Sequence, residues 1–567
     1  MLESTANVEA QRSGIVDRLT DSEPRPGHRR LSVCIINPRS QPSYWTFDFA
    51  TPFFNLGRGR QYSMANGPLL AVAALVPAEH EVVILDENVE EIDFESLKRF
   101  DVIGVTGMIV QANRMIEILT ELRNLPATLV VGGPYVTLCE QLFEEISDVR
   151  FIGEAEQTWP AFLTAFARGE QVANRYEQEE KTDMTRVPVP RFDLLKPGRY
   201  ATVPVQFSRG CPFLCEFCDI ITIFGRRPRV KRPEQVIAEL EALAAQGFAN
   251  CFLVDDNFIG NKVEAKRLLR QIIEWQQTRP TKIRFTTEAS INLANDPELI
   301  DLLVRANFAS VLIGIETPRE ASLTETRKHQ NVHGDSLLDK VFRIRAAGLE
   351  IAGGFIVGFD HDDEKIFDEQ FAFIQASGIA NLSIGLLQPL PTTPLYDRLL
   401  REGRLDFSDP EVNFIPKLMT REQLKLGFHK LVGQVFEAEA YFDRVFTARR
   451  TNPRHAIISS NQGGVRANAR SFAGAVIRAT MLGWAFAKAG ELRLHLRAAR
   501  NVLRRNASLG KSRLSFAELV TFSIWYWHFT CVTEQIGGTD FGTVRHPTRP
   551  PQSLTTRTPQ LSHGGSA

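Results

Sequence analysis

Two series of short apolar runs, each alternating with amphipathic stretches, organise most of the chain. In the first series, β-branched runs such as residues 31–37 and 81–86 alternate with helical patterns over residues 67–75 and 112–123. Alternation of this kind predicts a parallel sheet with helices on both faces. Glycines follow several of the predicted strands, at the edge where open α/β sheets bind ligands. The first series, residues 31–170, is therefore predicted to be a doubly wound binding domain.

The second series occupies residues 205–410 and contains six strand-like runs, each followed by a helical pattern. One of its helices begins at Pro233, carries Val236 and Leu240 on one stripe and ends before Gly247, as expected for a helix that packs on a sheet. Repeated βα units spaced by roughly 30 residues favour a barrel or a partial barrel. In such barrels the active site lies at the carboxyl ends of the strands.

Polar or helical segments surround these two series. Residues 1–30 and 541–567 lack an apolar period and are predicted to be disordered tails. Residues 171–204 are rich in Arg, Glu and Pro, which indicates a linker. Helical patterns take over at residues 411–540. The predicted fold is therefore α/β, with a doubly wound domain, a partial six-stranded βα barrel and a mainly helical C-terminal domain.

Composition and charge narrow the functional classes. The 567 residues are 43% hydrophobic and 23% charged, which is typical of a folded globular protein. The 66 basic and 67 acidic residues nearly cancel, so the chain has no net field that would attract a nucleic acid. Only three of the seven cysteines lie close together, unlike a disulfide framework, and the N-terminal residues do not resemble a secretory signal. We therefore expect a cytoplasmic protein.

One region departs from this neutral balance. Residues 444–513 contain 15 Lys or Arg residues and one acid, Glu491, a local charge of +14. An aromatic run follows at residues 516–532, interrupted by Glu518 and His528; it is too short and too polar for a membrane span but suits an interfacial helix. We therefore expect peripheral membrane contact through residues 444–532, at the inner face of the membrane. The alternative is a buried helix beside a solvated basic surface.

The segment SRGCPFLCEFCDI carries the strongest chemical signal. It places Cys211, Cys215 and Cys218 in a loop directly after a predicted strand, with the spacing C-x3-C-x2-C. Thiolates at this spacing bind soft metal centres, and three ligands are one fewer than a closed zinc site or a fully ligated iron–sulfur cluster uses. The loop therefore predicts a metal centre with one open coordination position. Cys251 begins the next strand and is expected at the opposite end from the loop.

With aromatic Phe217 just before the third cysteine, the loop resembles the radical S-adenosylmethionine (SAM) enzymes. Their [4Fe-4S] cluster leaves one iron free to bind the amino and carboxylate groups of SAM. The resemblance implies that Cys211, Cys215 and Cys218 hold the cluster and that Phe217 lies beside the cofactor. A structural zinc site, or a site made of thiols alone, is the alternative.

Residues at the ends of later strands resemble the SAM-contacting segments of this family. Asp255 and Asp256 stand where the family usually has a Gly-Gly-Glu-like segment that binds the amino group, so one of these acids is expected to replace it. Glu288 resembles the polar residue near the ribose hydroxyls. The element beside the adenine is matched by Gly314, Ile315 and Glu316. For each acid the alternative is a rim carboxylate that is satisfied by the backbone or by an arginine.

The N-terminal domain resembles the cobalamin-binding domain that precedes the barrel in one large branch of the family. The resemblance lies in small-residue turns after three successive strands, which let the backbone approach a bulky planar ligand and its nucleotide tail. The site residues implied are Thr106, Gly107, Gly132, Gly133, Pro134, Gly153, Glu154 and Glu156. A flavodoxin-like or Rossmann nucleotide binder is the alternative, although no G-x-G-x-x-G opens the first helix.

One departure from other cobalamin proteins matters chemically. Mutases place an imidazole on cobalt through Asp-x-His-x-x-Gly, whereas the only histidine within residues 31–170 is His80, at the entry to a strand. We therefore expect cobalamin to be bound without a lower axial histidine. This absence argues against mutase chemistry and is common in the radical branch.

The resemblance covers residues 31–410 and, more weakly, the C-terminal part, and it extends to a subgroup that includes hopanoid C-2 methylases and bacteriochlorophyll side-chain methylases. It implies a methyltransferase acting on an unactivated carbon of an apolar substrate, such as a hopanoid, a tetrapyrrole or another lipid-like molecule. One SAM would methylate reduced cobalamin, and a second would be cleaved to a 5′-deoxyadenosyl radical with an electron from a flavodoxin- or ferredoxin-type protein.

Two other functions stay open at this point. One is a cobalamin-dependent radical SAM cyclase or rearrangement enzyme, which product mass would separate from a methylase. The other is a non-catalytic cobalamin or iron–sulfur sensor. A nucleic-acid substrate is not expected, because the aromatic residues follow the basic stretch instead of alternating with it.

Overall fold

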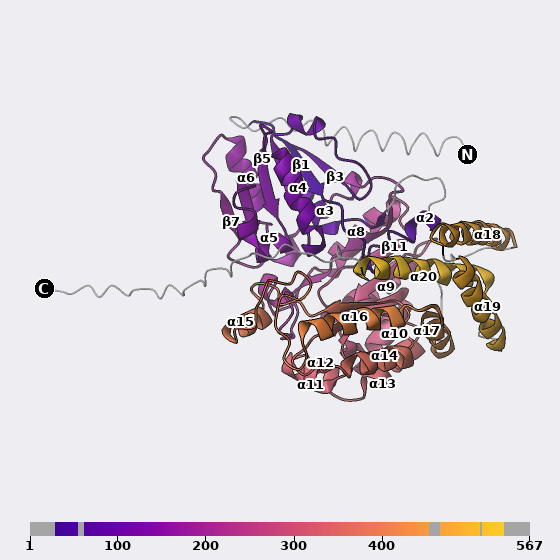
Figure 1. Ribbon diagram of the computed structural model, residues 1–567. Helices are drawn as coiled ribbons and strands as arrows, with labels where there is room; N and C mark the ends of the chain where they lie inside the picture. Colours follow the sequence, from indigo (N-terminus) through magenta and orange to yellow (C-terminus); the bar gives the residue numbers. More distant parts are fainter. Residues whose placement is uncertain (1–28, 55–61, 453–464, 491, 511–512, 538–567) are drawn as a thin grey trace, which may run out of the picture.

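The computed structural model describes residues 29–54, 62–452, 465–490, 492–510 and 513–537. Two α/β units lie one above the other, and the last helices of the chain lie at one side of them (Figure 1). The predicted tails, residues 1–30 and 541–567, lie outside the described residues except for positions 29 and 30.

The first unit contains a six-stranded parallel sheet with the strand order β3-β1-β4-β5-β6-β7. The strands are β1 (Ser32–Asn37), β3 (Glu81–Asp86), β4 (Val102–Thr106), β5 (Thr128–Gly132), β6 (Val149–Ile152) and β7 (Arg175–Glu177). The order reverses between β1 and β4, which is the topological switch point of a doubly wound sheet. Strand β7 comes from residues 171–204, the segment predicted to be a linker.

Helices cover both faces of this sheet, as predicted. They are α3 (Gly67–Ala74), α4 (Ala112–Leu122), α5 (Pro134–Leu138) and α6 (Thr158–Ala167). Helices α4 and α5 pack on one face through residues such as Met115 and Val136, and α3 and α6 pack on the other through Leu69 and Phe162. In α4 the buried positions recur every three or four residues, which gives the helix one apolar stripe.

The second unit is an open seven-stranded sheet with the order β15-β14-β13-β12-β11-β8-β2. Its strands are β2 (Tyr62–Met64), β8 (Tyr200–Val205), β11 (Asn250–Leu253), β12 (Arg284–Glu288), β13 (Phe308–Glu316), β14 (Glu350–Val357) and β15 (Leu382–Leu386). Six of them are the strands predicted from the sequence, and all neighbours are parallel. The sheet therefore forms the predicted partial barrel.

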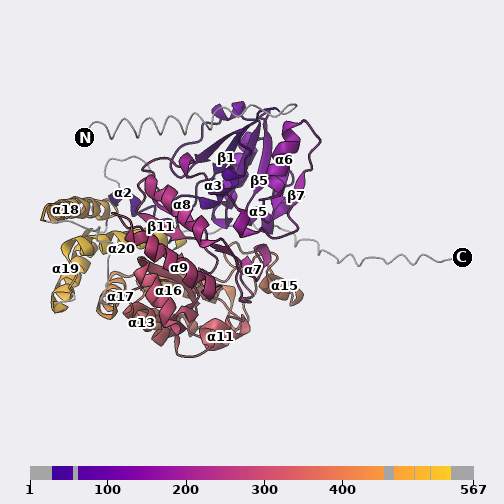
Figure 2. The same ribbon diagram turned by 180° about the vertical axis from the view of Figure 1, so that it is seen from behind.

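The outer helices of the barrel follow the sequence pattern. They are α8 (Pro233–Ala245), α9 (Lys262–Gln277), α10 (Pro297–Arg305), α13 (Leu337–Ala346) and α14 (Ile366–Ser377), of which α8 and α9 are prominent in the reverse view (Figure 2). Helix α8 starts at Pro233, buries Val236 and Leu240, and is followed by Gly247 at a φ of 82°. This left-handed conformation at the end of a helix favours glycine.

The C-terminal helices are α15 (Pro394–Arg401), α16 (Arg421–Val435), α17 (Ala438–Thr451), α18 (Val465–Lys488), α19 (Leu492–Ser508) and α20 (Phe516–Gly537). Helix α20 contains the aromatic run that was predicted to be interfacial, and here the prediction was wrong. Ile524, His528 and Phe529 are fully buried, and Phe529 stacks on Phe436, the residue that directly follows α16. Among the described residues, none of the helices combines the length and apolarity needed to cross a bilayer.

The predicted basic stretch is likewise only partly a surface. Arg444 is fully buried and donates hydrogen bonds to the Ile379 carbonyl and the Gln375 side chain. Burial lowers the pKa of Arg444 to about 9, so part of the local +14 charge lies inside the protein. Residues 453–464, 491 and 511–512 of this stretch lie outside the described part of the chain.

A short strand and a shared carboxylate join the two units. Strand β2, which follows the first strand of the N-terminal sheet in sequence, pairs with β8 of the barrel. Tyr200 of β8 donates a hydrogen bond of 2.9 Å to Asp86 at the end of β3. The other oxygen of Asp86 accepts hydrogen bonds from Asn37 and Asn88. The ends of β1 and β3 are therefore tied to the first strand of the barrel.

We predict that Tyr200→Phe lowers the free energy of unfolding by about 1.5–3 kcal/mol, because a buried carboxylate loses a hydrogen-bond donor. Tyr396→Phe is the matched control, since the buried Tyr396 hydroxyl has no hydrogen-bond partner in the described structure. Its removal should change the stability by less than about 0.5 kcal/mol. Denaturant unfolding of both variants under anaerobic conditions measures the difference. Equal losses in the two variants would contradict the proposed role of the junction.

Candidate active site

The cysteine loop follows β8 and is closed at its base by two short antiparallel strands. Strand β9 (Ser208–Arg209) pairs antiparallel with β10 (Arg229–Val230), and the loop lies between them. Gly210 has a φ of 95°, and a Cβ there would lie 2.8 Å from the Arg227 carbonyl and 2.9 Å from the Gly225 carbonyl. Only glycine fits this position, so the chain can turn tightly just before Cys211.

The thiols of Cys211, Cys215 and Cys218 lie close enough to one another to interact electrostatically. Cys215 is buried, and Cys211 and Cys218 are half-buried. Burial raises the pKa of both half-buried thiols, and the neighbouring Cys215 raises it further. Within the described residues no three His, Cys, Asp or Glu side chains close around a single metal ion. Cys251 is paired in register with Val203 and Phe285 and is separate from the loop, as predicted.

Two amide side chains that the sequence analysis missed donate hydrogen bonds to these sulfurs. Gln330, in α12 (His329–Val332), lies with its Nε2 3.5 Å from Cys215 Sγ, and Asn257 Nδ2 lies 3.9 Å from Cys211 Sγ. Lys328 Nζ lies 5.7 Å from the Phe217 ring centroid. Thiols with N–H donors and a nearby cation suit an anionic iron–sulfur cluster. No sequence motif identifies Gln330, Asn257 or Lys328, because their contacts with the loop are made by residues that are distant along the chain.

Asp255 and Asp256 hold the beginning of the cysteine loop. The Asp255 carboxylate accepts hydrogen bonds from the Phe207 amide at 2.7 Å and from the Ser208 hydroxyl at 2.8 Å. Asp256 accepts one from the Gly210 amide at 2.6 Å. Burial raises the pKa of Asp255 to about 7 and that of Asp256 to about 6. Both acids therefore use oxygens on the backbone of the loop, as in the alternative considered from sequence.

Glu288 differs from Asp255 and Asp256 in having no hydrogen-bond donor at its carboxylate among the described residues. It ends β12 on the same side of the barrel, and its carboxylate has no hydrogen-bond or ion-pair partner among the residues that the structure describes. Burial raises its pKa to about 8, and the nearby Asp256 and Asp255 charges act in the same direction. Glu288 is half-buried, and it is the acid of this group whose two oxygens both lack a partner among the described residues. Such a carboxylate is a candidate ligand-binding group.

The Gly314-Ile315-Glu316 element forms an irregular end of β13. The register with β14 shifts there, and Glu316 adopts a positive φ of 64°. The Glu316 carboxylate is paired with Lys328. A Cβ on Gly314 would clash with this carboxylate, so glycine is required there. Asn331 donates a hydrogen bond of 2.9 Å to the Ile315 carbonyl. The predicted element is therefore fixed by residues that follow it in sequence.

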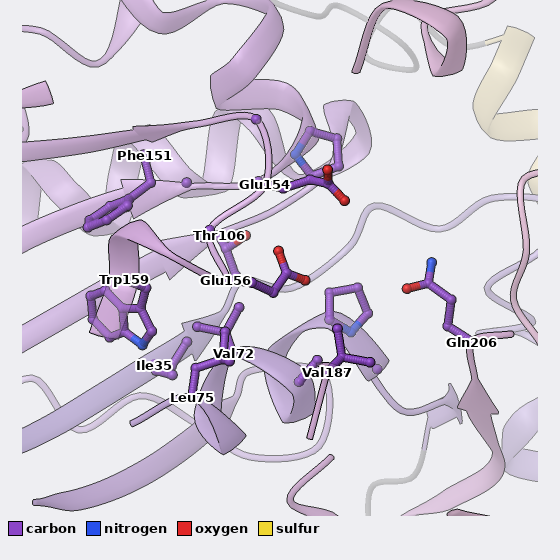
Figure 3. Close-up of a pocket in the computed structure, with 18 of the residues that line it drawn as sticks. Ile35, Val72, Leu75, Thr106, Phe151, Glu154, Glu156, Trp159, Val187 and Gln206 are labelled. Carbon is purple, nitrogen blue, oxygen red and sulfur yellow. The ribbon is translucent and has the colours of Figure 1, made fainter. Parts of the chain in front are cut away.

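A cavity of about 250 Å³ lies between the two units. Seven of the eight residues predicted for cobalamin line it: Thr106, Gly132, Gly133, Pro134, Gly153, Glu154 and Glu156. The eighth, Gly107, faces Met115 and Gln111 instead. Gln206, Arg209 and Val254 of the barrel line the other side. Figure 3 shows Glu154 and Glu156 between the apolar wall of the first unit and Gln206.

The deep part of the cavity is apolar. Its wall includes Ile35, Val72, Leu75 and Trp159, which the sequence indicates only as core positions (Figure 3). At its mouth, a Cβ on Gly133 would lie 2.4 Å from the Thr106 hydroxyl. An apolar cavity that opens at glycine turns fits a large ring with an inserted tail.

None of the described residues that line this cavity is a histidine. The buried His80 instead accepts a hydrogen bond from the Leu31 amide, at the start of β1 and thus at the opposite edge of the sheet. That cobalamin is bound without a lower axial histidine stays a prediction.

Glu154 and Glu156 also connect the cavity to the cysteine loop. Arg209, two residues before Cys211, lies 2.8 Å from Glu154 and 2.6 Å from Glu156. Arg229, on the partner strand of the hairpin, lies 3.0 Å from Glu154. The cavity and the cysteine loop therefore belong to one continuous site.

Comparison with known families agrees with this geometry. Residues 60–163 match the B12 binding domain, residues 205–374 match the Radical SAM superfamily, and residues 393–539 match a domain of unknown function (DUF4070). An uncharacterized methyltransferase of Synechocystis sp. is 38% identical over 425 residues, which cover 73% of this chain and 78% of that protein. The chain belongs to the cobalamin-dependent radical SAM enzymes.

Further relatives place the chain in the predicted subgroup. The hopanoid C-2 methylase of Rhodopseudomonas palustris is 33% identical over 418 residues, covering 73% of this chain and 78% of the methylase. The bacteriochlorophyllide d C-8(2)-methyltransferase of Chlorobaculum tepidum is 25% identical over 366 residues, covering 62% and 78%. The protein is thus a radical SAM methyltransferase, with a [4Fe-4S] cluster, SAM and cobalamin as cofactors.

Solved structures confirm the fold. The cobalamin-dependent SAM radical enzyme OxsB, solved with aqua-cobalamin and SAM, superposes with a TM-score of 0.56 at 13% identity, covering 89% of this chain and 80% of OxsB. The radical SAM methyltransferase TsrM from Kitasatospora setae gives a TM-score of 0.51 at 18% identity, covering 66% and 75%. The predicted order of a binding domain, a partial barrel and a helical region is confirmed.

We predict that Glu288→Gln stabilises the cofactor-free protein increasingly as the pH rises. The pKa of Glu288 lies near 8 in the fold against 4.5 ordinarily, so the folded state binds this proton more tightly and loses stability as the pH rises through that interval. The variant avoids this loss and should gain roughly 2–4 kcal/mol by pH 8.5. Thermal unfolding from pH 5 to 9 measures the gain, with exposed Glu274→Gln as the control. A gain that does not change with pH would contradict the assignment.

Proposed function

We propose that this enzyme adds a methyl group to an unactivated carbon of an apolar, lipid-like substrate such as a hopanoid or a tetrapyrrole. The observation that carries the proposal is the continuous site, in which one cavity touches both the glycine turns of the B12-binding domain and the base of the cysteine loop. The relatives named for methylation of hopanoids and bacteriochlorophyllides support an apolar substrate. When bound, SAM and its cluster supply a carbon radical, and cobalamin carries the methyl group.

Within this proposal the chain's own residues hold and shield the reactants. Cys211, Cys215 and Cys218 would ligate three irons of the cluster. The residues proposed to contact SAM are Phe217, Asp255, Asp256, Glu288, Gly314, Ile315 and Glu316. Among the acids, Glu288 is the best candidate for a direct contact, because its carboxylate has no partner in the described structure whereas Asp255 and Glu316 are already paired.

The glycine turns that line the cavity would hold cobalamin, namely Thr106, Gly132, Gly133, Pro134 and Gly153, with Gly107 behind them. Glu154 and Glu156 would act mainly by binding Arg209 and thereby fixing the cysteine loop relative to the ring. A closed apolar surrounding keeps water and stray hydrogens away from a reactive carbon centre. Cleavage of SAM needs an electron, which we propose comes from a flavodoxin- or ferredoxin-type protein.

Mass spectrometry of lipid and pigment extracts tests the proposal. Cells with the gene should contain a molecule heavier by one CH2 unit than its counterpart in cells without the gene, and the anaerobically reconstituted enzyme should form that product together with 5′-deoxyadenosine. A product without the added CH2 would instead indicate a cyclase, as named for a relative in Cereibacter sphaeroides that is 23% identical over 376 residues. Absence of 5′-deoxyadenosine would indicate a sensor.

For the reconstituted protein we predict that Cys215→Ala abolishes 5′-deoxyadenosine formation and removes most of the bound iron, because the cluster loses one of three ligands. Cys251→Ala is the matched control, since its thiol is also buried but lies in β11 away from the loop. Iron content and absorbance are measured after the same anaerobic reconstitution. Unchanged iron in the Cys215 variant would refute the assignment of the cluster ligands.

We also propose that the enzyme docks on the cytoplasmic face of an anionic membrane through α18 and α19, where an apolar substrate would be taken up. Trp484 and Ile477 of α18 are 68% and 50% exposed, and Leu496 and Leu503 of α19 are 58% and 55% exposed. Exposed Arg497, Arg500 and Arg504 lie beside the two leucines. Exposed apolar residues next to arginines match a headgroup interface with negative charge.

We predict that changing Arg497, Arg500 and Arg504 together to Gln weakens binding to vesicles containing phosphatidylglycerol by about 100-fold. The estimate uses roughly 1 kcal/mol for each basic residue at an anionic surface. The control changes the exposed Arg123, Arg267 and Arg305 to Gln, so the net charge falls equally at sites away from these helices. Co-sedimentation at two salt concentrations provides the measurement. Equal binding by the two triple variants would exclude this surface.

A further inference from the structure

We propose that Arg398, in the region that matches a domain of unknown function, is a positioning residue for the cysteine loop. The inference rests on the proposed function, since it takes this loop to hold the cluster. Glu216 lies between Cys215 and Cys218, and its side chain is only 6% exposed. Arg398 of α15 donates to both of its oxygens, from Nη2 at 2.6 Å and from Nε at 3.2 Å. This planar, two-point contact fixes the direction of the carboxylate as well as its distance.

The same guanidinium is held from its other side. Arg398 Nη1 lies 2.6 Å from Asp360, and Asp360 in turn binds Arg404 at 2.7 Å. Burial alone would raise the pKa of Asp360, but its hydrogen bonds with the two arginines lower the pKa below its usual value, so this carboxylate stays charged. Asp360 follows Phe359, whose ring centroid lies 5.9 Å from that of Phe217. Arg398 therefore links the cysteine loop to the end of β14.

Backbone contacts complete the anchor. The Glu216 amide donates to the Thr326 carbonyl at 3.0 Å, and the Leu395 amide, in the first turn of α15, donates to the Glu216 carbonyl at 2.9 Å. The residue between two of the cysteines is thus held by the barrel on one side and by α15 on the other. No other described residue pairs with the Glu216 carboxylate, so its orientation depends on Arg398.

The negative charge of the buried Glu216 carboxylate requires the Arg398 cation beside it. A buried carboxylate beside two thiolates is unfavourable unless a cation compensates it, and removal of one partner from a buried pair leaves the other charge unsatisfied. Without Arg398 the Glu216 side chain would turn toward water and carry the backbone of Cys215 and Cys218 with it. The first helix of the uncharacterised region therefore completes the cluster site, although none of its side chains is a ligand in the proposal.

The test combines Arg398→Gln, Glu216→Gln and the double variant, with Arg401→Gln as the control. Arg401 is exposed in the last turn of the same helix. In the cofactor-free protein we expect hydrogen exchange of the amides in residues 213–219 to be at least tenfold faster in Arg398→Gln and unchanged in Arg401→Gln. In the reconstituted protein, Arg398→Gln should release iron to a chelator faster and change the electron paramagnetic resonance spectrum of the reduced cluster. Arg398→Lys, which keeps the charge without the fork, should restore part of each effect.

The double variant decides between coupling and general destabilisation. If Arg398 acts through Glu216, the second substitution should add little to the effect of the first on hydrogen exchange. Additive effects, or a lower melting temperature with wild-type exchange in the loop and an unaltered spectrum, would overturn the proposal. Glu216→Gln preserves size and one acceptor, so it reports on the pair even if Arg398→Gln does not fold. Failure of the wild-type protein to take up iron would refute the proposed function, while the exchange experiment would still report on Arg398.

Discussion

Two acids of the N-terminal unit and two arginines of the barrel meet in a space that is nearly closed to water, and the active site depends on this contact. Glu154 and Glu156 end the turn after β6, whereas Arg209 and Arg229 form the base of the cysteine loop. Buried charges are tolerated only when their partners are well placed, so each unit fixes the position of the other. Chemistry that needs two cofactors at one carbon requires such a fixed relation.

The cysteine loop is held from three directions by parts of the chain that are distant in sequence. Asp255 and Asp256, at the end of β11, accept hydrogen bonds from its first residues. Gln330 of α12 donates a hydrogen bond to Cys215. Arg398 of α15 donates hydrogen bonds to Glu216. Each contact uses a polar group on the backbone or side chain of the loop. A short loop without regular structure is thereby ordered before any cofactor binds, which lowers the entropic cost of binding.

The acids at the rim of the barrel differ in the hydrogen-bond and ion-pair partners that surround them. Asp255, Asp256 and Glu316 are stabilised by amides, a hydroxyl or a lysine, whereas Glu288 is half-buried and has no such partner among the described residues. Burial raises the pKa of Asp255, Asp256 and Glu288, and the raised value is highest for Glu288, at about 8. The order of residues along the chain does not rank these acids, because each stands at or just after the end of a predicted strand.

Sequence alone determined most strands, most helices, the cysteine spacing and the glycine turns, because each follows from the preferences of residues that are neighbours along the chain. Only the tertiary structure decided that β2 joins the barrel, that α20 and Arg444 are internal, and that Arg398 pairs with Glu216 across 182 positions. A three-residue strand has no detectable period, and an aromatic or charged residue looks the same in sequence whether it faces solvent or protein. Burial and ion pairing belong to neighbours in space, and the fold alone chooses those neighbours.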